Sequence, residues 1–388
     1  MEREQAIKLV MDLLRELRER NGSDLFLTSG FPPAIKVDGK VTKVREEPLS
    51  HEHAALVVRA IMNDRQAKEF DATKECQFAI SPKIGRFRVS AFVQQGRIGA
   101  VLRTINTEIP TLAELDLPES LKDIVMSKRG LVIFVGATGS GKSTSLAAML
   151  GHRNDNTDGH IISIEDPIEY VHPHRRCIVT QREVGADTES WENALKNTLR
   201  QAPDVILIGE VRTRETMEYA IQFAETGHLV LCTMHANNAN QALDRVINFF
   251  PEEKREQVLM DLSFNLRSIV SQRLVRRESG GRVAAMEILL NTPLISDLIF
   301  KGEVSQIKEV MKRSTEQGMV TFDQFLFQLY EQHVISYSEA VRNADSQNEV
   351  RLQIKLNSKR GGRDLEEDEV VQGMSMQEVD EERSMFRR

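Results

Sequence analysis

The sequence predicts an α/β protein built from two folded parts. The chain has 388 residues, which is more than one hydrophobic core usually organises, so about two domains are expected. Short strand-like runs around one helical segment fill roughly the first hundred residues. Strand and helix patterns then alternate between residues 130 and 233, which is typical of a parallel sheet with helical crossovers. An α+β domain followed by a larger α/β domain is therefore expected.

The first part opens with an amphipathic helix. Apolar residues recur at helical spacing over residues 4–19, and Asn21 and Gly22 end the pattern. Apolar or alternating runs then predict four strands, with one helix between the second and the third. The strands are expected at 25–27, 34–37, 86–93 and 99–105, and the helix at 52–70.

The second part alternates strands and helices before it becomes mostly helical. Strands are expected at 130–136, 160–164, 205–209 and 228–233, with helices at 143–150, 191–200 and 213–226. Further helices are expected at 253–272, 293–300 and 304–313. The predicted division is a domain at 1–106, a linker at 107–118, a second domain at 119–356 and a tail at 357–388.

The composition bounds the class of protein. Apolar residues make up 40% of the chain and charged residues 28%, as in an average globular protein. No apolar run approaches the ~20 residues of a membrane-spanning helix, and the first residues lack a signal-peptide core. Three scattered cysteines build neither a disulfide framework nor a four-cysteine zinc site, so no structural zinc is expected. A cytoplasmic protein is predicted, with membrane contact only through partners.

Charge is concentrated at the C-terminal end. Residues 364–388 hold nine acidic and three basic residues, and the rest of the chain is close to neutral. A charged, aromatic-poor segment of this kind is predicted to be disordered, and it serves either solvation or the docking of a partner. Because the body has no basic field or tract, no nucleic-acid partner is expected.

A glycine-rich motif lies between an apolar strand and a helix. Residues 136–143 read Gly-Ala-Thr-Gly-Ser-Gly-Lys-Ser and satisfy G-x-x-x-x-G-K-[S/T]. Backbone N–H groups of such a turn and the following helix N-terminus bind phosphate, Lys142 reaches the β and γ phosphates, and the Ser143 hydroxyl ligates magnesium. ATP and Mg²⁺ are therefore the predicted ligands. The residues predicted to bind nucleotide are Gly136, Ala137, Thr138, Gly139, Ser140, Gly141, Lys142, Ser143 and Thr144.

Acidic residues follow two other predicted strands. Glu165, Asp166 and Glu169 follow the strand at 160–164, and Glu210 follows the apolar run that starts after Asp204. Nucleotides bind at the carboxyl edge of open α/β sheets, so these carboxylates could face the phosphates. The alternative interpretation is that each is a solvated loop residue.

One histidine and two arginines are further candidates, each with a simpler interpretation beside the functional one. His235 follows the strand at 228–233, where it either contacts the γ-phosphate or is a satisfied structural histidine. Arg88 and Arg103 lie on two adjacent predicted strands of the first domain. They either face solvent or act in trans on the nucleotide of a neighbouring copy.

Together these motifs resemble a known superfamily. Residues 199–212, Leu-Arg-Gln-Ala-Pro-Asp-Val-Ile-Leu-Ile-Gly-Glu-Val-Arg, resemble the signature of the secretion ATPases that drive type II secretion and type IV pili. Residues 23–30 and 32–39 are similar to the N-terminal PAS-like domain of the PilT/PilU family of pilus retraction ATPases. The resemblance covers about residues 5–345. Its remaining motifs are the Walker A motif at 136–144, the Asp box at 165–169, the Walker B motif at 204–210 and the His box at 227–235.

The resemblance implies a PAS-like domain followed by a RecA-like P-loop ATPase domain with a helical C-terminal part. It also implies a hexameric ring that hydrolyses ATP to retract type IV pili and support twitching motility. In this family the residue matching Glu169 positions the attacking water, and that matching Glu210 supports magnesium and its water. The residue matching His235 contacts phosphate, and Arg88 and Arg103 match two family arginines.

The sequence departs from the family pattern in two places. Thr213 stands where the Walker B signature usually has aspartate. Residues 294–301 lack both arginines of the corresponding PilT segment, and together with the acidic tail this favours the PilU branch over the PilT branch. The resemblance implies a PilT-type retraction ATPase and an inner-membrane pilus platform protein as partners, at the cytoplasmic face of the inner membrane.

Three alternatives remain open. The first is an accessory ATP-binding ring that couples PilT-type force with little hydrolysis of its own. The second is a pilus assembly or type II secretion ATPase, which typically has a longer N-terminal region and often a tetracysteine zinc insertion. The third is a DNA-translocating motor, which the absence of a basic tract disfavours.

Overall fold

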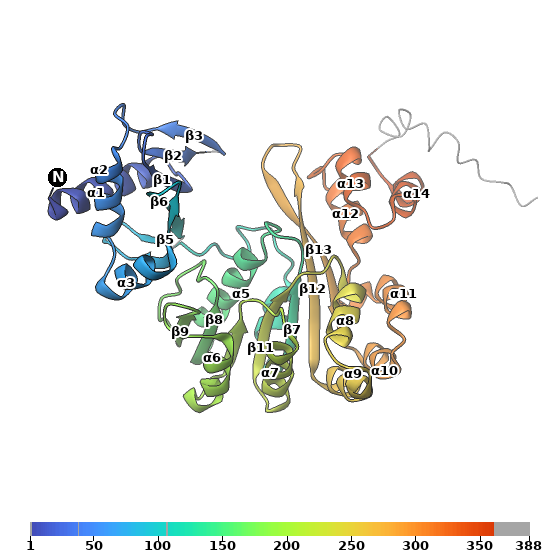
Figure 1. Ribbon diagram of the computed structural model, residues 1–388. Coiled ribbons are helices and arrows are strands. Elements are labelled where there is room, and N and C mark those ends of the chain that lie inside the picture. Colours follow the sequence, from blue (N-terminus) through green and yellow to red (C-terminus); the bar gives the residue numbers. More distant parts are fainter. Residues whose placement is uncertain (1, 38, 106–107, 361–388) are drawn as a thin grey trace, which may run out of the picture. The chain divides into compact units, whose positions relative to one another are not determined.

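A computed structural model describes residues 2–37, 39–105 and 108–360 (Figure 1). Contacts divide the chain into two compact units, one made of residues 1–111 and 146–209 and the other of residues 112–145 and 210–388. The predicted domain boundaries at residues 106, 118 and 356 stay a prediction. Most of the predicted acidic tail, residues 361–388, lies outside the described residues.

The N-terminal region forms a six-stranded antiparallel sheet in the order β3-β2-β1-β6-β5-β4. Helix α1 (Arg3–Glu19) spans the predicted amphipathic segment, and its apolar side joins the core of this region, as Leu13 and Leu17 are fully buried. The strands are β1 (Asp24–Thr28), β2 (Ala34–Val37), β3 (Lys40–Lys43), β4 (Glu75–Ile80), β5 (Arg86–Gln94) and β6 (Arg97–Ile105).

The single helix predicted at 52–70 is wrong, because the chain forms two helices there. They are α2 (His51–Ala60) and α3 (Asp64–Thr73). Asn63 starts the second helix: its side chain accepts from the Gln66 backbone N–H, and the Gln66 side chain accepts from the Asn63 N–H. Such a reciprocal capping box satisfies two helix-end donors and so fixes a new helix start.

The second sheet has seven strands in the order β13-β12-β7-β11-β10-β8-β9. The predicted parallel pairing is confirmed for β7 with β11 and for β8 with β10. Strand β8 also pairs parallel with β9, a strand that the sequence pattern did not predict, while β12 and β13 pair antiparallel. Strands β7 and β11 are buried along their whole length, as expected of parallel strands covered on both faces. The strands are β7 (Gly130–Val135), β8 (Gly159–Glu165), β9 (Cys177–Glu183), β10 (Val205–Ile208), β11 (Leu229–Met234), β12 (Leu266–Arg276) and β13 (Arg282–Leu290).

The helix predicted at 253–272 is also wrong in its second half. Helix α9 (Arg255–Asn265) ends at Asn265, and β12 begins at the next residue. Strand β12 pairs with β7 on one side and β13 on the other, so its backbone groups are satisfied from both sides. An apolar run of this length fits either structure by periodicity alone, and tertiary pairing decides.

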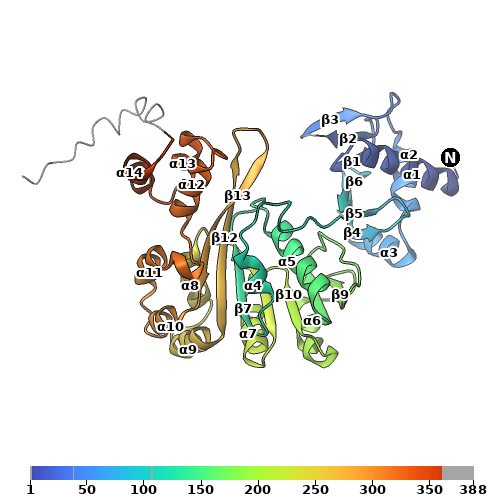
Figure 2. The same cartoon turned by 180° about the vertical axis from the view of Figure 1, so that it is seen from behind.

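Some helices alternate along the chain with the strands of the second sheet, and others follow its last strand (Figure 2). The predicted helix at 293–300 is confirmed at both ends. Beyond it, α12 to α14 pack with Val275 and Val283 of the β12–β13 hairpin around a separate core. In the part of the chain that the structure describes, no helix has the length and apolar character needed to cross a membrane. The helices are α4 (Ser120–Val125), α5 (Lys142–Asn156), α6 (Trp191–Thr198), α7 (Arg214–Glu225), α8 (Ala239–Asn248), α10 (Pro293–Phe300), α11 (Ile307–Arg313), α12 (Phe322–Glu331), α13 (Tyr337–Asn343) and α14 (Gln347–Asn357).

Candidate functional site

The glycine-rich loop joins the end of β7 to the start of α5, as the sequence predicts. Gly139 and Gly141 have φ angles of 77° and 87°, a region that side chains with a Cβ atom rarely adopt. A Cβ atom on Gly136 would lie 2.5 Å from the backbone oxygen of Gln272, so that position lacks room as well. The motif therefore has glycine where the loop curves tightly and where it packs against β12.

The lysine and serine of the motif lie in the first turn of α5. The Lys142 ammonium donates hydrogen bonds to the carbonyl oxygens of Gly136 and Ala137, at 2.7 Å and 3.1 Å. The Lys142 side chain therefore folds back over the glycine-rich loop. Ser143 is exposed, while the buried Ser140 hydroxyl has no hydrogen-bond partner among the described residues.

Glu210 and His235 lie beside each other in the same unit as the loop. The Nε2 atom of His235 is 2.9 Å from Oε1 of Glu210. The other carboxylate oxygen of Glu210 accepts a 2.6 Å hydrogen bond from Nη2 of Arg212. Two residues that the sequence places after different strands are thus in contact, and Arg212 binds the second oxygen of the Glu210 carboxylate.

The surroundings of Glu210 favour its ionised form. Burial by itself raises the pKa of the carboxyl, but the hydrogen bond and charge of Arg212 oppose burial. The charges of His235 and Lys142 act in the same direction, and the pKa ends below its usual value. Glu210 is accordingly a carboxylate at neutral pH.

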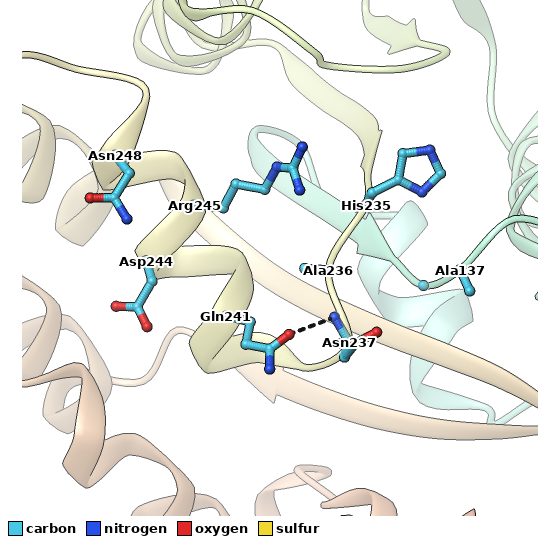
Figure 3. A pocket seen from close by; sticks show the side chains of 9 residues that line it. Ala137, His235, Ala236, Asn237, Gln241, Asp244, Arg245 and Asn248 are labelled. Carbon is cyan, nitrogen blue, oxygen red and sulfur yellow. Dashed lines mark hydrogen bonds between the residues drawn. The ribbon is translucent and has the colours of Figure 1, made fainter.

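A cavity of about 460 Å³ opens beside the loop and the His box (Figure 3). Gly136 and Ala137 form one wall, and the segment that leads from His235 into α8 forms another. Figure 3 shows the Arg245 side chain extending towards the side where His235 lies. The other residues lining the cavity are Ala236, Asn237, Gln241, Asp244 and Asn248.

The acids of the Asp box belong to the other unit and differ from one another. Glu165 accepts hydrogen bonds from the Ser163 hydroxyl at 2.6 Å and the Gln181 amide at 3.1 Å. Burial raises the pKa of Glu165 despite these two hydrogen bonds. Glu169 is exposed. Of the two glutamates, Glu165 is therefore hydrogen-bonded within its own unit, whereas Glu169 is exposed to solvent.

Arg88 and Arg103 are direct cross-strand partners in the register of β5 and β6. Arg88 donates a 2.7 Å hydrogen bond to Oε1 of Gln77. Arg103 donates a 2.7 Å hydrogen bond to Asp24, a carboxylate that is itself buried. Directly opposed residues leave the same face of a sheet, and here the Arg88 guanidinium turns to Gln77 on β4 while the Arg103 guanidinium turns to Asp24 on β1.

Three residues of the site, Arg212, Arg245 and Gln272, are not among those predicted from the sequence. Arg212 had a local signal, because it lies two positions after the Walker B glutamate. Arg245 lies on a helix with ordinary amphipathic spacing, and Gln272 lies in a segment predicted to be helical. Neither Arg245 nor Gln272 belongs to a sequence motif, and only the folded structure brings them to the site.

The loop fits a nucleotide phosphate chain and a magnesium ion. Its backbone turns at glycine, a helix of 15 residues begins at Lys142, and the Ser143 hydroxyl and the ionised Glu210 would supply oxygen ligands to such an ion. Hard oxygen donors of this kind suit Mg²⁺. The fold and the loop thus define a P-loop nucleotide-binding protein with a mainly parallel sheet.

Comparison with known proteins narrows this class. A family model described as type II/IV secretion system protein matches residues 1–380, and the chain belongs to that family. The type IV pilus ATPase PilU of Pseudomonas aeruginosa is 61% identical over 95% of this chain and 97% of its own length. The type IV pilus retraction ATPase PilT of the same organism is 43% identical over 86% of this chain and 98% of its own length.

A solved structure is similar over most of the fold. It is a crystal structure of the pilus retraction motor PilT with bound ADP, and it matches with a TM-score of 0.83 and 38% identity. The match covers 88% of this chain and 98% of the PilT chain. The predicted architecture, a PAS-like domain followed by a RecA-like ATPase domain, and the predicted preference for PilU over PilT are both confirmed.

Proposed function

We propose that this protein is an ATP-hydrolysing motor of the PilU kind that assists type IV pilus retraction and twitching motility. The observation that carries the proposal is its 61% identity to the pilus ATPase PilU across 95% of the chain. The sequence also has the complete Walker A motif at 136–144, together with Glu169, Glu210 and His235. The relation to PilT, whose crystal structure holds ADP, supports nucleotide binding at the loop.

The loop binds the phosphates of ATP in this proposal. Backbone N–H groups of residues 136–144 and the N-terminus of α5 face the phosphate oxygens. Lys142 exchanges its two carbonyl contacts for phosphate oxygens, because the ammonium then gains an oppositely charged partner in place of a neutral one. Phosphate binding therefore competes with contacts that hold the loop closed on itself.

The carboxylates divide the remaining work. Mg²⁺, when bound, neutralises charge that develops on the phosphates. Ser143 and Glu210 would hold the ion, Glu210 partly through water, and the lowered pKa of Glu210 keeps it ionised for that role. Glu169 orients the attacking water, a role that suits an accessible carboxylate better than the internally bonded Glu165. His235, held beside Glu210, contacts the γ-phosphate.

The arginine pair acts in a ring. We place Arg88 and Arg103 against the nucleotide of a neighbouring copy in a homo-hexamer, where a second cation stabilises transition-state charge. Their direct pairing on β5 and β6 supports this role, since both side chains leave the same face of the sheet. Hydrolysis around the ring would then drive the N-terminal domains against the ATPase domains.

The partners follow from the same function. A PilT-type retraction ATPase and the inner-membrane platform protein of the pilus machine are the proposed partners, and the motor works at the cytoplasmic face of that membrane. Membrane contact occurs through these partners, in keeping with the absence of a spanning helix among the described residues.

Complementation tests the proposed function. A piliated bacterium that lacks its PilU-type ATPase is given this chain, its Lys142→Ala variant, or Glu192→Gln as a surface control. We expect the wild type and the control to restore twitching motility and Lys142→Ala to fail, because the lysine holds the phosphates. Accumulation of the wild-type protein without any recovery of twitching would contradict the proposal.

A further inference from the structure

Gln272 reaches the nucleotide loop from the neighbouring strand β12. Its side chain is buried and uses both ends of its amide. The Nε2 atom donates a 2.8 Å hydrogen bond to the carbonyl oxygen of Ser140, inside the loop. The Oε1 atom accepts a 2.8 Å hydrogen bond from the hydroxyl of Ser145, in the first turns of α5. One side chain therefore joins the loop to the helix that follows it.

Two glycines of the loop lie so close to Gln272 that neither position has room for a Cβ atom. A Cβ atom on Gly136 would lie 2.5 Å from the backbone oxygen of Gln272, and a Cβ atom on Gly141 would lie 2.8 Å from its Nε2 atom. Both distances are too short for a real Cβ atom. Gln272 thus packs directly against Gly136 and Gly141 and is hydrogen-bonded to Ser140 in the same loop.

A neutral amide suits this place. It satisfies a loop carbonyl and a helix hydroxyl that would otherwise be buried without partners, at a cost of about 1–3 kcal/mol for each group. It carries no charge, so it neither repels the phosphates nor competes with them for Lys142. Gln272 can therefore fix the loop without taking part in the chemistry.

We propose that Gln272 is a positioning residue that holds the loop in the shape that binds nucleotide phosphates. It acts through Ser140 and Ser145, and it touches neither the nucleotide nor the reacting water. The inference rests on the proposed nucleotide site at residues 136–144. It predicts that loss of the amide weakens nucleotide binding while leaving the chemical step intact.

Gln272→Met tests the proposal, because methionine keeps the volume and the unbranched shape but loses both hydrogen bonds. We expect ADP affinity, measured by calorimetry on the full chain, to fall about tenfold, as the loss of one to two buried hydrogen bonds implies. In ATP hydrolysis the KM should rise by a similar factor, while kcat at saturating ATP stays within about twofold. Unchanged ADP affinity, or a fall in kcat with KM unchanged, would overturn the proposal.

Two further variants make the result decisive. Ser268→Ala is the matched control, since Ser268 is also buried on β12 but donates its hydroxyl to Leu289. It should lower the melting temperature without changing ADP affinity, and an equal loss of affinity would show a general effect of the strand. Ser145→Ala removes one of the two hydrogen bonds and should weaken ADP binding about threefold.

Ser145→Ala also decides the case in which Gln272→Met does not fold, because unchanged affinity in Ser145→Ala would then overturn the inference. Lys142→Ala separates this inference from the proposed function. If Lys142→Ala leaves ADP affinity unchanged, the nucleotide site itself is wrong. If Lys142→Ala weakens binding and Gln272→Met does not, the positioning role alone is wrong.

Discussion

Glu165 and Glu169 lie four residues apart and meet different surroundings. Glu165 is bound by Ser163 and Gln181, and burial raises its pKa, whereas Glu169 is exposed. The box therefore contains one internally satisfied carboxyl and one accessible carboxylate. A water-orienting residue needs an accessible carboxylate that is free to accept a hydrogen bond from water.

Glu169→Gln should keep nucleotide binding and lower hydrolysis at least about a hundredfold, because an amide cannot accept a proton from water in the same way. The measurement is ADP affinity together with ATP turnover, and Glu192→Gln, an exposed helix position, is the matched control. Full turnover in the Glu169 variant would show that another group orients the water.

Glu287 introduces a pH dependence of stability that is independent of the nucleotide. It is buried on β13 and accepts a 2.7 Å hydrogen bond from the Ala239 N–H at the start of α8. Burial raises its pKa to about 7, and Asp345 adds to the rise while the Ala239 N–H, Lys308 and Arg273 oppose it. The folded protein therefore keeps a proton that the unfolded chain loses from about pH 4.5 upward.

Stability contributed by this proton should fall as pH rises from about 4.5 to about 7 and then level off. The free energy of unfolding of Glu287→Gln, relative to that of the wild type, should therefore rise by up to about 3 kcal/mol when the pH is raised from 5 to 8. Urea unfolding of both proteins at the two pH values measures the difference. A difference that does not change with pH would contradict the assignment.

At the scale of elements, β12 contacts two parts of the structure through successive side chains. Gln272 faces the nucleotide loop, and Arg273 donates to the carbonyl of Asn343 and to Asp345 at 2.7 Å and 2.6 Å. The Arg273 guanidinium also lies 4.1 Å from the centre of the Phe322 ring. Because neighbouring residues of a strand point to opposite faces, one strand holds both the loop and the C-terminal helices.

Arg273→Ala should lower the free energy of unfolding by about 2 kcal/mol, since it leaves a largely buried Asp345 with fewer cations and removes the contact with Phe322. Arg276→Ala, an exposed position on the same strand, should change it by less than about 0.5 kcal/mol. Urea unfolding measures both. Equal effects of the two substitutions would show that the Arg273 contacts carry no stability.

Local signals predicted some elements well and failed at others for physical reasons. Thr292 caps α10 and Pro293 begins it, so local chemistry sets its start at the predicted residue. The break between α2 and α3 depends on Asn63, whose capping role within a helical pattern is easily overlooked. Strand β12 depends on β7 and β13, and no local pattern states which partners a segment will find.

The same division applies to the candidate site of the whole molecule. The loop at residues 136–144 is contiguous in sequence, so its motif predicted it directly. The contact between Glu210 and His235 follows from strand order, which the alternating pattern implied. Gln272 lies 132 positions from Ser140 along the chain, so only the folded structure brings the two together.

The whole molecule is proposed to be a motor, and ATP hydrolysis by the purified chain tests that claim most directly. Wild type and Lys142→Ala are compared, each alone and with a PilT-type ATPase. We predict turnover by the wild-type protein alone that disappears in Lys142→Ala. Absence of turnover by the wild-type protein alone, with or without stimulation by the partner, would contradict an autonomous motor and favour an accessory ring that couples force.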